Sequence, residues 1–270
     1  MKLTYSLTWL PDVLKASGLK VELVAGWEAR GRGDVGEILG VLCHHTAGAK
    51  KGNMPSLDLL IKGRPDLPGP LSQLGLARDG TFYVIAAGKC NHAGQGNWKG
   101  IRAGNTHLIG IEAENTGLPD DPWPAVQIDA YQRGVAAILK HTGRTFDFCV
   151  AHKEYAPKRK YDPSFDMEPF RKAVQAIMTG TANTSETVSP VEPQPAEPQP
   201  VDSKPAQPVL KRGATGELVK ELQAKVGAAI DGQFGPGTEE KVRAFQRAHN
   251  LGDDGIVGPA TWAALGAITA

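Results

Sequence analysis

The chain has 270 residues, and 30 Lys and Arg against 29 Asp and Glu give it a formal net charge of +1. This near-neutral balance lacks the basic excess that is typical of nucleic-acid-binding proteins. No apolar run approaches the ~18–20 residues of a membrane-spanning helix. We therefore expect neither nucleic acid nor membrane insertion. Three Cys without a CxxC pair argue against a disulfide scaffold and favour reduced thiols.

The N-terminus does not resemble a secretory signal. Met1–Thr8 carries a single Lys, and Pro11 and Asp12 follow closely. A signal peptide would instead place a longer apolar stretch after its basic residues. We therefore expect synthesis in the cytoplasm.

A Pro-rich segment divides the chain into three parts. Residues 179–208 hold seven Pro between Pro190 and Pro208 and almost no large apolar side chain. Such a segment cannot bury enough apolar surface to offset the entropy lost on ordering, so it is typical of a semi-rigid linker. The expected organisation is a large domain over 1–178, a linker over 179–208 and a small domain over 209–270.

Strand and helix patterns alternate through the large domain. Val126–His141 repeats apolar residues at helical spacing and ends at Gly143, and Asp79-Gly80 between two apolar runs predicts a β-hairpin. This interleaving predicts an α/β fold with a central mixed β-sheet flanked by helices. In chain order, the expected elements are helix 10–17, strands 21–25 and 38–43, helix 54–61, strands 74–78, 81–86 and 108–113, helix 126–141, strand 148–151 and helix 167–177.

The small domain contains an internal repeat. Asp231–Thr238 (DGQFGPGT) returns 23 residues later as Asp254–Thr261 (DGIVGPAT). Glu217–Val226 and Thr238–Ala248 show helical spacing, and Trp262 and Leu265 would close a core. We expect a module of three helices, in which the repeated turns are either structural or contact a ligand.

Three polar side chains follow or lie near the ends of predicted strands. His44 follows the strand that ends at Cys43, His152 follows the strand that ends at Ala151, and Asp162 lies ten residues further on. Imidazole and carboxylate groups are good zinc ligands, and a catalytic zinc site uses three of them. The residue types alone are also compatible with an alternative to a metal site, in which one histidine lies in the core, the other lies on the surface and the aspartate is solvated.

A set of motifs, in order, resembles the type 2 N-acetylmuramoyl-L-alanine amidases, which include phage endolysins and are related to peptidoglycan recognition proteins. The motifs are VLCHHTAG, GLARDGTFYVIAAG, NHAG, IGIEAENTG and AHKEYAPKRKYDPSFDM, between residues 40 and 173. The repeated DGxxGPxT resembles a three-helix peptidoglycan-binding module.

The resemblance implies roles for individual residues. It implies zinc ligands at His44, His152 and Asp162, although some relatives have Cys at the last position. Glu112 in IGIEAEN matches the acidic catalytic residue, and Lys160 in RKYDP matches the basic stabiliser of the transition state. A carboxylate can take a proton from the attacking water, and an ammonium can stabilise an oxyanion.

Other residues near these motifs leave alternatives open. His92 in NHAG either contacts substrate or braces its loop, and Trp98 and Trp123 either stack on a sugar or cover an edge. Asn91 is a further candidate for substrate contact. His45 should point away from His44 and pack beneath the site, since side chains alternate along a strand. Glu114 is either a second candidate base or an ion-pair partner. We expect Cys43 and Cys149 to be core thiols.

The resemblance implies a zinc-dependent amidase that cleaves the lactyl–L-Ala amide of bacterial peptidoglycan. A phage endolysin that is made in the host cytoplasm, released through a holin and acts as a monomer on the wall fits best. Two rivals remain: a non-catalytic peptidoglycan binder or sensor, and a zinc peptidase that cuts within the stem peptide. A complete set of ligands argues against the sensor.

Overall fold

A computed structural model describes residues 5–181, 209–249, 251 and 255–266 of the chain. The chain divides into two units, Met1–Ala182 and Asn183–Ala270. The expected linker over 179–208 lies, from residue 182 on, outside the described residues. The precise domain boundaries therefore stay predictions.

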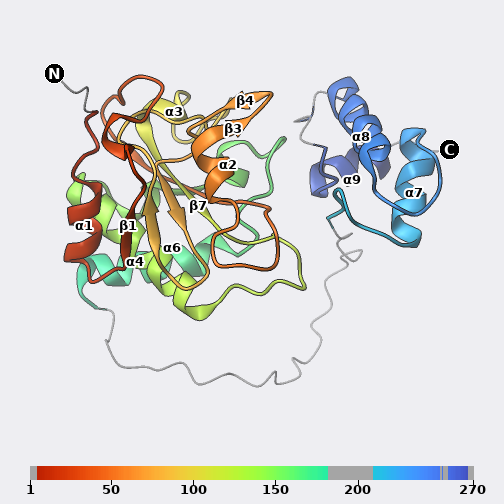
Figure 1. Cartoon of the computed structure of the whole chain (residues 1–270). Coiled ribbons are helices and arrows are strands. Elements are labelled where there is room, and N and C mark those ends of the chain that lie inside the picture. The colour runs from red at the N-terminus through yellow and green to blue at the C-terminus, as the bar shows by residue number, and fades with distance from the viewer. Residues whose placement is uncertain (1–4, 182–208, 250, 252–254, 267–270) are drawn as a thin grey trace, which may run out of the picture. The chain divides into compact units, whose positions relative to one another are not determined.

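Six strands of the larger unit form one mixed sheet, in the order β1-β6-β5-β7-β2-β8 (Figure 1). All neighbouring pairs are parallel except β5 and β6, which form the hairpin around Asp79-Gly80. The α/β class with a mixed sheet is therefore confirmed. The strands are β1 (Val21–Leu23), β2 (Gly40–His45), β5 (Leu74–Leu76), β6 (Phe82–Val84), β7 (Leu108–Ala113) and β8 (Cys149–Ala151).

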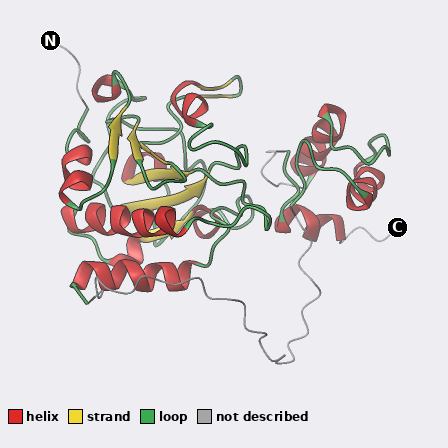
Figure 2. Ribbon diagram, turned by 60° about the horizontal axis from the view of Figure 1, so that its bottom comes forward, coloured by secondary structure: helices red, strands yellow, loops and turns green. Residues whose placement is uncertain are grey.

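Three helices cover one face of this sheet. They are α1 (Leu10–Ala16), α4 (Ala125–His141) and α6 (Met167–Thr179), and Figure 2 shows the two long ones along one side of the strands. Their apolar stripes, with Leu14, Tyr131 and Phe170, form one buried cluster with every second residue of the central strands. In β2 these are Val41 and Cys43. Leu42, between them, points to the opposite face.

Shorter elements and loops cover the opposite face. Two apolar clusters lie there, one around Leu42, Leu108 and Val150 and one around Leu60 and Ile85. The remaining elements of this unit are α2 (Leu57–Lys62), α3 (Gly104–His107), α5 (His152–Tyr155), the short hairpin β3 (Gly63–Arg64) and β4 (Leu67–Pro68), and the 3-10 turns Trp27–Ala29 and Phe146–Phe148.

The sequence patterns locate the long elements well and the short ones poorly. The strand expected over 38–43 is observed as Gly40–His45, so both histidines lie within it rather than after it. The two-residue strands β3 and β4 and the four-residue helices α3 and α5 have no pattern long enough to show a period. Cys43 and Cys149 are fully buried free thiols, as expected.

The smaller unit contains α7 (Glu217–Val226), α8 (Pro236–Ala248) and α9 (Pro259–Gly266). Its core includes Leu222, Val242, Phe234 and Trp262. The three-helix expectation is confirmed, whereas Asp254 of the repeat lies outside the described residues. No helix in the described ranges combines the length and apolarity that crossing a membrane requires.

Two buried glutamines show that the sequence repeat is also a structural repeat. The Gln223 Oε1 accepts hydrogen bonds from the amides of Asp231 and Gly232, and its Nε2 donates to Thr238 Oγ1 at 2.9 Å. One period later, Gln246 Oε1 accepts from the Gly255 amide, and its Nε2 donates to Thr261 Oγ1 at 3.2 Å. Each glutamine therefore ties one Gly-rich turn to the helix before it.

We predict that Gln223→Leu destabilises the smaller unit by roughly 2–4 kcal/mol, because it leaves buried amides without an acceptor. Amide hydrogen exchange in α7 and α8 of the full chain measures this loss. Gln233→Ala is the control, since the Gln233 side chain is exposed. Equal exchange in Gln223→Leu and wild type would contradict the structural role of the glutamine.

Candidate metal centre

The central strands bring three of the predicted residues to one edge of the sheet. His44 in β2 is the register partner of Glu112 in β7, and β8 pairs with β2 on its other side. His44, Glu112 and His152 continue the alternation of Leu42, Leu108 and Val150, so they share the face opposite α4 and α6. The parallel direction of the three strands places their C-terminal ends together.

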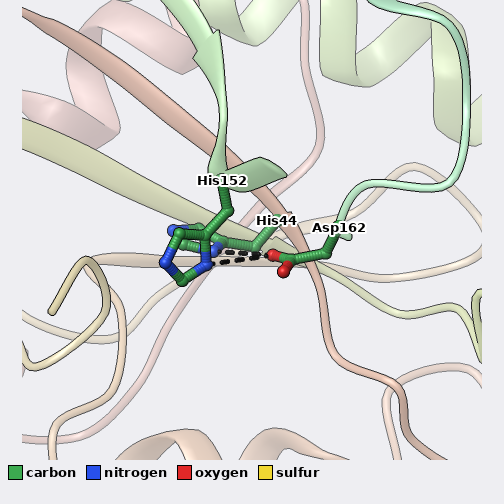
Figure 3. A group of neighbouring side chains, drawn as sticks. All are labelled: His44, His152 and Asp162. Carbon is green, nitrogen blue, oxygen red and sulfur yellow. Dashed lines mark hydrogen bonds and ion pairs between the residues drawn. The ribbon is translucent and has the colours of Figure 1, made fainter. Parts of the chain in front are cut away.

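His44, His152 and Asp162 converge on one point (Figure 3). Asp162 Oδ2 lies 3.0 Å from His44 Nδ1 and 3.2 Å from His152 Nδ1. All three side chains are buried. Asp162 reaches the site from the loop after α5, and its carbonyl accepts a hydrogen bond from the Lys153 amide at 2.8 Å.

The hydrogen bond on the far side of His152 fixes its tautomer. His152 Nε2 lies 2.9 Å from the carbonyl oxygen of Ala93, which can only accept. Nε2 therefore carries the proton, and the Nδ1 lone pair faces Asp162. Burial lowers the pKa of His152 to about 4, against the opposing charge of Asp162, so the ring is neutral near pH 7.

His92 fixes the tautomer of His44 in the same way. His92 Nε2 lies 3.2 Å from the carbonyl oxygen of Leu108, so its Nδ1 is an acceptor, and His44 Nε2 donates to it at 3.2 Å. Burial, with the charges of His44 and His152, holds the pKa of His92 well below its usual range. His44 Nδ1 is therefore the ring nitrogen that faces Asp162.

A glycine in β7 makes room for the His92 ring. A Cβ at position 110 would lie 2.7 Å from His92 Cγ and Nδ1, closer than such contacts occur. This explains Gly110 within an apolar strand. Of the two alternatives for His92, the structure supports bracing of the site, while contact with substrate stays a prediction.

Asp162 Oδ2 lies within hydrogen-bond and ion-pair distance of both imidazoles, and a cation between the three groups would replace the imidazole protons on that side. Zn²⁺ with bonds of ~2.0 Å in tetrahedral geometry places its ligand atoms about 3.3 Å apart. The two separations from the carboxylate oxygen, 3.0 and 3.2 Å, are close to this value, and all three ligand atoms lie within 4.8 Å of one another. The outer hydrogen bonds to Ala93 and His92 are of the kind that orients zinc-bound histidines. These residues therefore fit zinc.

The carboxylate of Asp162 is held in its charged form. Burial raises its pKa, but His152 and His44, when protonated, lower it further through their charges and hydrogen bonds, and the net pKa is well below the usual range. When both imidazoles have lost the proton that faces the carboxylate, as metal binding requires, the donor set carries the single negative charge of Asp162.

Glu112 lies beside this group without joining it. Its Oε1 is 3.8 Å from His44 Nδ1, and its buried Oε2 has no hydrogen-bond partner among the described residues. Burial, opposed by the charge of His44 and helped by that of Asp162, raises the pKa of Glu112 to about 7. A carboxyl group with such a pKa can exchange a proton near neutrality. Its catalytic role stays a prediction.

Lys160 is half-buried on the loop that leads to Asp162. Its positive charge acts on both Glu112 and His152, lowering the pKa of each. The ammonium is therefore close enough to Glu112 and His152 to act on both through its charge. Its role toward substrate stays a prediction.

Glu114 is a structural acceptor. Its carboxylate is buried and accepts from Thr46 Oγ1 at 2.8 Å, from the Ser56 amide at 2.9 Å and from Ser56 Oγ at 3.0 Å. It thereby ties the loop after β2 to the end of β7. These hydrogen bonds engage the Glu114 carboxylate, which the sequence suggested as a second candidate for the catalytic base.

Asn91 and Trp98 are engaged in loop contacts. Asn91 Nδ2 donates to the carbonyl of Pro68 at 2.9 Å. Trp98 Nε1 donates to the carbonyl of Asp147 at 3.3 Å, and its ring packs on the cluster around Leu42. Their contact with substrate is untested and stays a prediction.

Arg159 is a site residue that sequence reasoning missed. Its Nη2 donates to the carbonyls of Ala93 at 2.6 Å and Gln95 at 2.8 Å. Arg159 and His152 therefore share the Ala93 carbonyl, which fixes the NHAG loop against the site. The signal available in the sequence was the basic run KRK just before Tyr161, but nothing in that run distinguishes Arg159 from its neighbours.

Comparison with known proteins gives the same division of the chain. Residues 34–165 match the family described as N-acetylmuramoyl-L-alanine amidase, and residues 215–265 match the family described as putative peptidoglycan binding domain. The chain is 32% identical over 148 residues to the N-acetylmuramoyl-L-alanine amidase CwlL of Bacillus licheniformis. The aligned segment covers 50% of this chain and 39% of that protein.

Two further similarities involve a peptidase and a solved structure. The chain is 48% identical over 61 residues to the zinc D-Ala-D-Ala carboxypeptidase of Streptomyces albus G. The aligned segment covers 20% of this chain and 24% of that protein. A solved complex of the amidase AmiD from E. coli is similar with a TM-score of 0.44 and 18% identity, over 88% of this chain and 91% of that one.

The chain spans between 24% and 57% of the length of the curated relatives that it matches. The two family matches nevertheless fall on separate segments, and each segment lies within one of the two units of the structure. Residues 34–165 are thus similar to the N-acetylmuramoyl-L-alanine amidase family, and residues 215–265 to the family of putative peptidoglycan binding domains.

Proposed function

We propose that the chain is a zinc-dependent N-acetylmuramoyl-L-alanine amidase, which hydrolyses the amide between the lactyl group of N-acetylmuramic acid and L-alanine of the stem peptide. The observation that carries the proposal is the convergence of His44, His152 and Asp162, whose ligand atoms all lie within 4.8 Å of one another, beside a buried carboxylate oxygen of Glu112 that has no partner among the described residues. The similarity to the amidase CwlL supports the same reaction.

The residues divide the chemistry between them. His44, His152 and Asp162 hold the zinc, which supplies a Lewis acid and lowers the pKa of water toward ~7. Glu112 takes the proton from the attacking water and passes it to the leaving amine of L-alanine, and its raised pKa suits both steps. Lys160 stabilises the negative charge that develops on the carbonyl oxygen of the amide.

The smaller unit serves as a wall anchor in this proposal. Its family match supports binding to peptidoglycan, the polymer that the larger unit would cut. A second binding site on the same polymer raises the local concentration of substrate, so modest affinity suffices. Domains over 1–178 and 209–270, joined by a linker over 179–208, complete this organisation.

Host lysis is the biological role that we propose. The enzyme would be made in the host cytoplasm of a phage-infected bacterium, reach the wall after a holin opens the membrane, and act there as a monomeric bacteriolytic endolysin. A wall-recycling amidase is the weaker alternative, because soluble wall fragments need no wall-binding domain.

Product analysis tests the activity. Purified peptidoglycan is incubated with zinc-loaded or chelated protein, and the soluble products are identified by mass spectrometry. We expect stem peptides that begin with L-alanine, and only with zinc. Cuts within the peptide would identify a zinc peptidase, and intact peptidoglycan that retains the protein would identify a binder or sensor.

We predict that Glu112→Gln lowers the rate by about 10²–10⁴-fold and leaves zinc content unchanged, because it removes the proton acceptor and no metal ligand.

Lys160→Met should lower kcat by about 10²–10³-fold with the same zinc content, because it removes the charge beside the oxyanion. Rates on a soluble muropeptide and metal analysis measure both effects. Full activity of either zinc-loaded variant would reject that residue's role.

The raised pKa of Glu112 predicts how the stability of the metal-free protein changes with pH. The pKa is about 7 in the folded state against 4.5 ordinarily, so between these values the folded state binds more protons than the unfolded state. The free energy of unfolding of the metal-free wild type should therefore fall as pH rises from 4.5 through 7. Relative to Glu112→Gln, the fall should be at most about 3 kcal/mol.

Urea unfolding of chelated wild type and Glu112→Gln at pH 5 and pH 8 measures this difference. The free energies of unfolding should diverge in favour of the variant at pH 8. A gap between the two proteins that does not change with pH would show that Glu112 titrates normally.

We predict that deleting residues 209–270 spares cleavage of small soluble muropeptides and weakens binding to intact walls. Co-sedimentation with walls and product release from soluble fragments measure the two effects separately. Loss of both in the truncated protein would contradict the picture of an anchor that acts independently of catalysis.

A further inference from the structure

His45, next to the first metal ligand, points to the other face of the sheet. It ends β2 and continues the alternation of Val41 and Cys43, which face α4 and α6. Its side chain is 5% exposed, and its Nδ1 accepts a hydrogen bond from the Ser164 amide at 3.2 Å. Two successive residues of one strand therefore contact the same loop, since His44 contacts Asp162.

The loop passes around the C-terminal end of β2. Asp162 lies on the metal side, whereas Phe165, three residues later, packs on the cluster beneath α4 and α6. Ser164 lies between them and is held at two atoms, since its amide donates to His45 and its Oγ accepts from Trp123 Nε1 at 2.9 Å. The Trp123 ring in turn packs edge-on against Phe165, with ring centroids 4.9 Å apart.

The His45 ring is itself held in place. The Tyr161 ring lies on one side of it, with centroids 5.4 Å apart, and the backbone of Gly117 approaches it closely. A Cβ at position 117 would lie 2.3 Å from His45 Cε1, and the φ of 74° also favours glycine there. These contacts hold the His45 ring, and with it the acceptor atom Nδ1, in a fixed position.

We propose that His45 is a positioning residue for the Asp162 ligand: by accepting the Ser164 amide, it fixes the loop so that the Asp162 carboxylate meets His44 and His152. This inference rests on the proposed function in so far as Asp162 holds zinc. A ligand on a loop has to be fixed to within about 0.5 Å by its supporting contacts. The bond between His45 and Ser164 supplies such a contact two residues after the ligand.

A packing role for His45 makes a different prediction from a positioning role. If only the volume of the ring matters, Leu and Asn at position 45 should behave alike, because both are smaller than His and similar in shape. If the acceptor matters, Asn should replace His, because its Oδ1 occupies nearly the position of Nδ1. Leu places a methyl group there and cannot accept the Ser164 amide.

The experiment measures zinc affinity by competition with a chelator for wild type, His45→Asn and His45→Leu in the full chain. We expect His45→Leu to bind zinc about 10–100-fold more weakly, as for other residues that orient metal ligands. His45→Asn should recover most of this loss. Leu14→Ala, in the core under α1, controls for general destabilisation, since Leu14 is buried far along the chain from the loop.

Amide exchange of Ser164 in the metal-free proteins tests the contact without zinc. We expect protection in wild type and His45→Asn and faster exchange in His45→Leu. Equal zinc affinity of His45→Leu and wild type, or equal losses in the Asn and Leu variants, would overturn the inference. If wild type bound no zinc but its Ser164 amide were protected from exchange, the proposed function would be rejected and the contact between His45 and Ser164 would stand.

Should His45→Leu fail to fold, Trp123→Phe is the second variant. It keeps an aromatic ring against Phe165 and removes the hydrogen bond to Ser164 Oγ, together with part of the indole that lies near His45. We expect zinc affinity a few-fold weaker than wild type and faster exchange of the Ser164 amide. Affinity and exchange that both equal those of wild type would overturn the inference.

Discussion

The contact of two imidazoles with one carboxylate is the interaction on which the candidate site depends. Asp162 Oδ2 lies 3.0 Å from His44 Nδ1 and 3.2 Å from His152 Nδ1. Hydrogen bonds on the far sides of both imidazoles hold the rings with Nδ1 toward the carboxylate. The protein thus uses the hydrogen-bonding capacity of its NHAG loop to keep the point between the donors attractive to a cation.

The sheet sorts these groups by the alternation of side chains along its strands. On β2, β7 and β8, one set of side chains packs under α4 and α6, and the other set faces the opposite side, where His44 and Glu112 follow Leu42 and Leu108. Tyr131 of α4 reinforces this arrangement from behind, because its hydroxyl contacts both the amide and the carbonyl of His44. The backbone that carries the first ligand is therefore anchored in the core.

Sequence patterns located what is periodic and local, and missed what depends on neighbours in space. The fold class and the long helices follow from apolar spacing, whereas the three donor residues were candidates by residue type and were assigned as ligands only by the resemblance to a known family. Nothing in the sequence shows that His92 lies behind His44, that Arg159 shares the Ala93 carbonyl, or that Glu114 holds Thr46 and Ser56. Each of these contacts joins segments at least 48 residues apart in the chain, and no local period encodes such a distance.

The ligands differ in how they are carried. His44 lies within a central strand, whereas Asp162 lies on a loop that crosses the end of that strand. A strand position cannot move without its hydrogen-bonded neighbours on both sides, whereas a loop can shift by fractions of an ångström to suit a longer or shorter metal bond. The loop position is therefore where such a site can exchange oxygen for sulfur during evolution, leaving the rest of the protein unaltered.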